Sequence, residues 1–310
     1  MRAIGLESFE AGPMLLDLPI PEVGPGEVLV KVGFASINGF DVSVAAGGVK
    51  DYMEHRLPVV LGKDFAGTVE AVGDGVTRVE PGDSVFGVLV REYVGDGTFA
   101  DYVIMPESIG LTKLPAGLEQ SVAGAVGLAG TAAHSSVSAV SPSDGESLLI
   151  SGATGGVGVL AIQLARRLGA SVIATARPGK EADFVSRFGA GHTVDFTGDI
   201  SAQVRSIYPG GVDAAIHLAG DGFELAELVR AGGRFASTLG LGPDNFGDRD
   251  LQVTSVMAMP TGDVLDELAA RALSGELEVP IERTYKLEEV PRAFDDFAQG
   301  TLGKFGVSVS

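Results

Sequence analysis

A glycine-rich segment in the middle of the chain has the residue types and spacing of a phosphate-binding loop. Residues 151–158 read Ser-Gly-Ala-Thr-Gly-Gly-Val-Gly, between the apolar run 147–150 and a helical pattern. Glycines let the backbone approach phosphates, and free N–H groups at the helix N-terminus offset the negative charge. This pattern predicts a site for the pyrophosphate of NAD(P), formed by Gly152, Thr154, Gly155, Gly156, Val157 and Gly158. A tight turn without ligand is the alternative in a chain with 45 glycines.

The end of the second expected strand indicates which dinucleotide is bound. NAD-binding proteins place Asp or Glu about twenty residues past the glycines, where it accepts hydrogen bonds from the ribose hydroxyls. This chain has Ala-Thr-Ala-Arg-Pro-Gly-Lys at 174–180. Arg177 can donate two hydrogen bonds to a 2′-phosphate and Lys180 adds a positive charge, which predicts NADPH. Because Glu181 follows directly, two solvated basic residues on a loop are the alternative.

The elements around these residues alternate between strand and helix. Apolar residues at helical spacing follow the glycines, namely Val157, Leu160, Ala161, Leu164 and Leu168. Helical stretches also separate the first five of six expected strands, which are 147–151, 171–175, 192–194, 213–218, 233–237 and 253–257. Such alternation requires a parallel sheet covered by helices on both faces. Ligands of these sheets gather at the carboxyl ends of the strands, where this chain has Ala219, Gly220, Leu239, Gly240 and Leu241.

The remaining chain has a different pattern. From residue 1 to about 117, short alternating runs are broken by Gly and Pro, which predicts a mostly antiparallel β domain. Residues 119–140 are expected to form a helix that bridges the two domains. After the parallel sheet we expect a helix, a short strand, a second helix and a last strand at 262–273, 285–287, 290–299 and 306–309.

Composition excludes several classes of partner. The net charge of −19 repels a nucleic-acid backbone, and no basic stripe overrides it. The chain has no cysteine, so disulfides and thiolate metal sites are excluded. No apolar run is long enough for a membrane span or a signal peptide, so we expect a cytoplasmic protein that binds neither nucleic acid nor membrane.

Four strings in the first domain are similar to the medium-chain dehydrogenase/reductase family, and most closely to its quinone oxidoreductase (zeta-crystallin-like) branch. They are Gly24–Val30, Leu57–Gly67, Pro81–Gly87 and Gly97–Val103. With the glycine-rich segment in its expected place, the resemblance covers essentially the whole chain. It implies an α/β protein with two domains: a GroES-like, mostly antiparallel β catalytic domain (1–121 and 260–310) and a Rossmann NADP-binding domain with a doubly wound parallel sheet (122–259).

The resemblance also indicates that the protein works without zinc. Zinc-dependent relatives carry Cys, His and usually a further Cys or Asp at the positions that resemble Asn38, Lys63 and Gly127. Asn and Gly are not normal zinc ligands, and a lysine repels the cation. The chain lacks the four cysteines of the structural zinc lobe, and its histidines show no ligand spacing: His55, His134, His192 and His217. We therefore predict no metal site.

Further site residues follow from the resemblance. Asn38 resembles an asparagine beside the nicotinamide and substrate, and Tyr52 lies where quinone reductases often have a tyrosine; both are our candidate hydrogen-bond donors. Thr131 resembles a threonine close to the nicotinamide, and Lys304 resembles the lysine of a Gly-Lys motif near the final strand. A local structural role is the alternative for each. We also expect Lys63 and Asp64 to form a charged pair, with Asp64 more structural than catalytic.

These observations give a leading hypothesis and two alternatives. The resemblance implies an NADPH-dependent, zinc-independent reductase of quinones or α,β-unsaturated carbonyls. One alternative is an enoyl-thioester reductase of fatty acid or polyketide metabolism, and the other is a non-catalytic NADPH-binding protein. The last expected strand of the parallel sheet, 253–257, would be an apolar edge, so we predict a homodimer joined through it.

Overall fold

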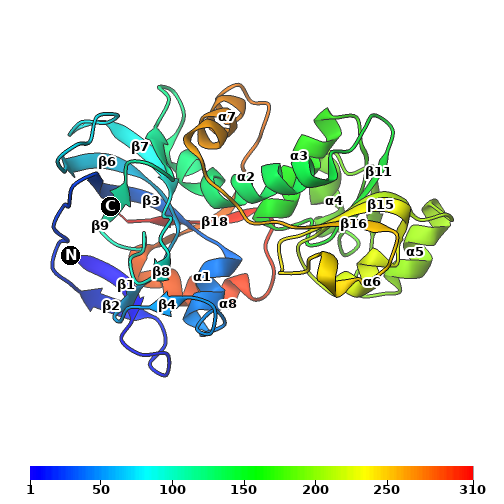
Figure 1. Cartoon of the computed structure of the whole chain (residues 1–310), viewed down its shortest axis with the longest axis horizontal. Helices are drawn as coiled ribbons and strands as arrows, with labels where there is room; N and C mark the ends of the chain where they lie inside the picture. Colours follow the sequence, from blue (N-terminus) through cyan, green and yellow to red (C-terminus); the bar gives the residue numbers. More distant parts are fainter. Residues whose placement is uncertain (310) are drawn as a thin grey trace. The chain divides into compact units, whose positions relative to one another are not determined.

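The structure is a computed structural model that describes residues 1–309, and it divides into two compact units (Figure 1). One unit combines Met1–Leu128 with the chain from Pro260 onward, and the other is Ala129–Met259. The first division falls inside helix α2 (Gln120–Val140), seven residues after the boundary expected from the sequence. The second division falls between Met259 and Pro260.

The Ala129–Met259 unit is built on a parallel sheet whose strands run in the order β13-β12-β11-β14-β15-β16. This order reverses between β11 and β14, and ligands of doubly wound sheets bind at such a point. The predicted Rossmann fold is therefore confirmed. The elements are β11 (Ser147–Ile150), α3 (Gly156–Arg167), β12 (Ser171–Thr175), α4 (Lys180–Arg187), β13 (His192–Val194), α5 (Ile200–Ile207), β14 (Val212–His217), α6 (Gly222–Ala226), β15 (Val229–Ser237), the 3-10 helix Pro243–Asn245 and β16 (Leu251–Ser255).

Two details of this unit differ from the sequence predictions. Strand β16 begins and ends two residues before the predicted range 253–257. Leu168 is 50% exposed, whereas Leu160, Ala161 and Leu164 are buried as predicted. The reason is that α3 ends at Arg167 and the chain turns at Gly169, which has a positive φ of 85°. Leu168 therefore lies beyond the last turn whose face contacts the sheet.

The other unit contains the predicted antiparallel sheet, with strands in the order β10-β7-β6-β3-β18-β17 and with β9 also paired to β3. Exceptions to the antiparallel pattern are the parallel pairs β17–β18 and β4–β8. The sequence did not predict helix α1. The elements are β1 (Arg2–Leu6), β2 (Met14–Asp17), β3 (Glu27–Ile37), α1 (Gly39–Ala45), β4 (Glu54–His55), β5 (Val59–Val60), β6 (Asp64–Val72), β7 (Ser84–Val88), β8 (Tyr93–Val94), β9 (Tyr102–Pro106), β10 (Leu111–Lys113), α7 (Gly262–Leu273), β17 (Ile281–Lys286), the 3-10 helix Leu287–Glu289, α8 (Val290–Phe297) and β18 (Lys304–Ser308).

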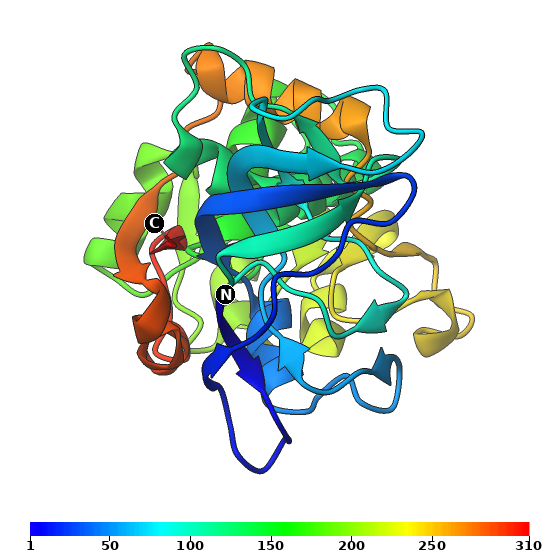
Figure 2. The same cartoon turned by 90° about the vertical axis from the view of Figure 1, so that its left-hand side faces the viewer.

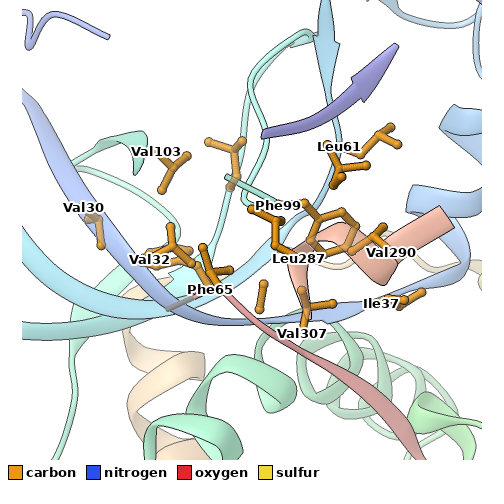
Figure 3. Packing of buried hydrophobic residues seen from close by; sticks show 14 of the residues in the cluster. Val30, Val32, Ile37, Leu61, Phe65, Phe99, Val103, Leu287, Val290 and Val307 are labelled. Carbon is orange, nitrogen blue, oxygen red and sulfur yellow. The ribbon is translucent and has the colours of Figure 1, made fainter. Parts of the chain in front are cut away.

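The last segment of the chain completes this unit, as the resemblance implies. Strand β18 pairs antiparallel with β3, so that Phe305 is opposite Ile37. In Figure 2 the first strands are blue and the last elements are orange and red, and both belong to this unit. Residues from both parts of the sequence form one core, including Val30, Val32, Ile37, Leu61, Phe65, Phe99, Val103, Leu287, Val290 and Val307 (Figure 3). Burial of this shared apolar surface holds β18 beside β3.

Candidate functional site

The glycine-rich segment forms a close-fitting turn between β11 and α3. Gly152 has a positive φ of 61°, a conformation that favours glycine. A Cβ atom on Gly158 would lie 2.6 Å from the Cα atom of Ala153, so no larger residue fits without a shift. No side chain caps α3, whose N-cap is Gly155, so its first N–H groups face the turn without a side-chain acceptor. This geometry fits a phosphate group of a dinucleotide.

A cavity of about 310 Å³ lies beside this turn, at the carboxyl ends of β11, β12 and β14. Gly152, Thr154, Ala219 and Gly220 line it, which brings four of the predicted cofactor residues together with Thr175, Phe196 and Asp221. The cavity lies where the strand order reverses and beside a glycine-rich turn, and both features are typical of a site for a nicotinamide dinucleotide.

Several side chains that sequence reasoning missed fix the loops around this cavity. Ser151 Oγ accepts hydrogen bonds from the backbone N–H groups of Leu218 (3.0 Å) and Ala219 (3.3 Å). Thr175 Oγ1 accepts one from Gly152 N (3.1 Å). Both residues end or directly follow a strand, and this position was the signal that could have identified them. Both side chains hold the cavity wall in place by accepting hydrogen bonds from its backbone N–H groups.

His217 links the next two loops. Its Nδ1 lies 3.0 Å from Ser237 Oγ and its Nε2 lies 3.1 Å from Gly220 O, and the ring is buried. Ser237 Oγ in turn accepts a hydrogen bond from Leu239 N (3.1 Å). The predicted residues Leu239, Gly240 and Leu241 therefore lie on a loop tied to the cavity wall, although they do not line the cavity; the Leu239 side chain is 54% exposed.

Arg177 and Lys180, the residues predicted to bind a 2′-phosphate, follow β12. Both are exposed. Arg177 is ion-paired with Glu181: its Nε donates to Glu181 Oε1 (2.8 Å) and its backbone N donates to Glu181 Oε2 (2.8 Å). The guanidinium beside Glu181 helps to hold the pKa of that carboxyl below its usual range, against the opposing effect of partial burial. Two basic groups are therefore present after β12, and Arg177 has an acidic partner.

Asn38 and Lys304 belong to a buried polar cluster in the antiparallel unit. Lys304 Nζ donates to Asn38 Oδ1 (2.6 Å) and Ile37 O (3.0 Å), and lies 3.4 Å from Asp64 Oδ2. Asp64 also accepts hydrogen bonds from Ser36 Oγ (2.6 Å), Asn38 Nδ2 (2.8 Å) and Leu128 N (2.7 Å). All side chains in this cluster are almost completely buried, and the β18–β3 pairing brings them together.

The expected pair between Lys63 and Asp64 is wrong, because Asp64 pairs with Lys304 instead. Neighbouring side chains on an extended backbone point to opposite sides, so Lys63 points away from the cluster. Its ammonium lies 5.0 Å from the centroid of the Phe40 ring, and burial lowers its pKa. Burial raises the pKa of the nearby Asp41 carboxyl to about 7, partly offset by a hydrogen bond from Asn38 N.

Tyr52 and Thr131 lie on different elements. Tyr52 lies in a turn between α1 and β4 and is 85% exposed. Thr131 lies in α2 and is completely buried. Residues 1–309 contain no group of three His, Asp or Glu side chains that could hold a metal ion. Across the same residues, no helix is both long and apolar enough to cross a membrane.

Comparisons with known proteins agree with this architecture. Residues 24–116 match the Alcohol dehydrogenase GroES-like domain, and residues 156–258 match the Zinc-binding dehydrogenase family. A quinone oxidoreductase of Lama guanicoe is 30% identical over 98% of this chain and 96% of its own length. A mycocerosic acid synthase-like polyketide synthase of Mycolicibacterium smegmatis is 35% identical over 87% of this chain, which spans 13% of that protein's length.

Solved structures show the same arrangement. The quinone oxidoreductase from Coxiella burnetii has a TM-score of 0.89 at 25% identity, over 100% of this chain and 99% of its own. A mycobacterial protein in complex with NADPH has a TM-score of 0.86 at 26% identity, over the whole of both chains.

The chain therefore belongs to the medium-chain dehydrogenase/reductase family, as its sequence motifs indicated, and it is similar to the quinone oxidoreductases of that family.

Proposed function

We propose that this protein is an NADPH-dependent reductase that transfers hydride to quinones or α,β-unsaturated carbonyl compounds without zinc. The observation that carries the proposal is the close-fitting turn of Gly152 and Gly158 at the carboxyl edge of a parallel sheet, beside a cavity of about 310 Å³. The quinone oxidoreductase relatives support the choice of acceptor. The NADPH complex of a similar structure and the basic residues after β12 support the choice of cofactor.

The residues of this chain supply binding and electrostatics for the proposed reaction. A nicotinamide cofactor, when bound, would supply the hydride. The backbone of the glycine turn would hold its pyrophosphate, and Arg177 with Lys180 would hold the 2′-phosphate. Asn38 and Tyr52 are our candidates to stabilise the negative charge that develops on the acceptor oxygen. Asn38 Nδ2 already donates to Asp64 Oδ2 and Ser36 O (3.3 Å), so it must exchange one of these partners for the substrate.

Turnover measurements test this proposal. We expect NADPH oxidation with at least one member of a panel of quinones, enones and enoyl thioesters. Asn38→Ala and Tyr52→Phe should each lower kcat about 10²–10³-fold and leave the NADPH dissociation constant nearly unchanged, because the loss of one such donor costs this much. Wild-type rates from both variants would remove these residues from the mechanism. Binding of NADPH without turnover across the panel would favour a non-catalytic NADPH-binding protein.

A second candidate function is an enoyl-thioester reductase of fatty acid or polyketide metabolism. The similarity to part of a mycocerosic acid synthase-like polyketide synthase favours it. An acyl carrier would prefer a basic surface at the entrance, whereas this chain has a net charge of −19. Comparison of kcat/KM for an enone and for the enoyl thioester with the same reacting group separates the two candidates. A preference for the thioester of more than tenfold would favour the second.

We also propose a homodimer that forms through the β16 edge and a cytoplasmic location. Strand β16 is the edge of the parallel sheet, and Leu251 and Val253 on it are only half-buried. An edge of this kind offers unpaired N–H and C=O groups to a second strand. Light scattering at micromolar concentration should give twice the mass of the chain. A monomeric mass would contradict the dimer.

A further inference from the structure

The cavity beside the glycine turn is bordered by a compact charged group after β12. Phe196 lines the cavity, and the Arg177 guanidinium lies over its ring, 5.9 Å from the centroid. Arg177 therefore stands at the rim of the cavity, close to the end of the strand where the ribose of a dinucleotide binds. Lys180 begins α4 next to it. Arg177 and Lys180 are thus two positive charges that follow β12.

Two acidic residues lie close to Arg177. Glu181 accepts hydrogen bonds from the Arg177 guanidinium and from its backbone N–H, so the carboxylate covers one edge of the guanidinium fork. The Glu181 side chain is 15% exposed, which indicates an ordered carboxylate rather than one mobile in solvent. Asp195 lies near enough to raise the pKa of Arg177 further, although Glu181 has the larger effect. Arg177 therefore has two acidic neighbours, Glu181 and Asp195.

We infer that Glu181 is a specificity-determining residue that limits the preference for NADPH over NADH by competing for the Arg177 guanidinium. This inference rests on the proposed function. A 2′-phosphate must displace the Glu181 carboxylate from the Arg177 guanidinium or share the guanidinium with it. The negative charge of the carboxylate also repels the phosphate. The 2′-hydroxyl of NADH is neutral and can donate to that carboxylate. Glu181 therefore weakens the binding of NADPH and has little effect on the binding of NADH.

The direction of the effect follows from charge. A 2′-phosphate carries up to two negative charges, and while Glu181 occupies the Arg177 guanidinium the phosphate lacks a charge-assisted hydrogen bond worth about a factor of ten in affinity at an exposed site. The NADH ribose has no such charge. Removal of the carboxylate charge should therefore tighten NADPH by about tenfold and change NADH by less than about twofold.

Equilibrium titrations of the whole protein with NADPH and NADH, followed by cofactor fluorescence, test the inference. The key variant is Glu181→Gln, which removes the charge but keeps an oxygen that accepts from Arg177. Asp183→Asn is the matched control, because it removes an equal, exposed charge from the same first turn of α4. We expect the affinity ratio of NADPH to NADH to rise about tenfold in Glu181→Gln and to change less than twofold in the control.

A second background separates competition from simple repulsion. In Arg177→Ala, the further change Glu181→Gln should alter the ratio by less than about threefold, because no guanidinium is left to release. An unchanged or lower ratio in Glu181→Gln would overturn the inference, as would a tenfold rise in the Arg177→Ala background. Failure of the wild type to bind either cofactor would instead contradict the proposed function.

Discussion

Replacement of Lys304 by methionine tests the buried polar cluster most directly. Lys304 is 3% exposed and Asp64 is completely buried, so Lys304→Met leaves a carboxylate in the interior without its cation. Loss of one partner of such a pair costs about 3–5 kcal/mol in the free energy of unfolding. Asn38 Oδ1 and Ile37 O also lose their Lys304 donor, at about 1–3 kcal/mol for each unsatisfied group. Three remaining donors to Asp64 lower the first cost, so we expect a total of at least about 3 kcal/mol.

Urea denaturation followed by tyrosine fluorescence measures this change. The signal reports mainly on the antiparallel unit, because it contains four of the five tyrosines: Tyr52, Tyr93, Tyr102 and Tyr285. Lys31→Met is the control, since Lys31 is exposed on β3 and should change stability by less than about 0.5 kcal/mol.

A double variant separates the charge effect from a general packing effect. Lys304→Met combined with Asp64→Asn removes both charges, so it should be less destabilised than the sum of the single variants by about 1–3 kcal/mol. Lys304→Met within about 1 kcal/mol of wild type, or strictly additive variants, would refute the assignment of a coupled buried pair.

Three further predictions concern protons, the cofactor turn and metal. Because the pKa of Asp41 is about 7 in the folded protein and 3.8 is its ordinary value, the folded state binds more protons between these values, and the contribution of Asp41 to stability is lost as pH rises from about 4 to 7. Asp41→Asn should therefore gain stability relative to wild type over that range in urea titrations; a pH-independent difference would contradict this. Gly158→Ala should weaken NADPH binding at least tenfold, because its Cβ would meet Ala153 in the glycine turn, and calorimetry showing wild-type affinity would contradict the role of this turn in cofactor binding. Elemental analysis should find no stoichiometric zinc and chelator should leave activity intact, since Asn38 and Lys63 are at the positions that resemble zinc ligands in zinc-dependent relatives; one tightly held zinc per chain would overturn this.

The sequence alone determined the parts of the protein whose signals are local. The glycine spacing of 151–158 identified the turn before α3, because only a narrow range of residues allows its φ angles and its close approach to Ala153. Apolar runs and helical spacing located the strands of the parallel sheet to within a few residues. The right-handed crossovers between them then left few possible topologies, so the fold class could also be predicted.

Only the tertiary structure decided which charged residues meet. Lys304 and Asp64 are separated by 240 positions, and the pairing of β18 with β3 brings them together in the interior. Lys63 directly precedes β6 and Asp64 begins it, and the side chains of these adjacent residues point in different directions, which sequence proximity could not show. The sequence shows Glu181 four positions after Arg177, but the hydrogen bond between their side chains depends on geometry in the first turn of α4. Charge pairing is set by distance and burial, and both are properties of the folded chain.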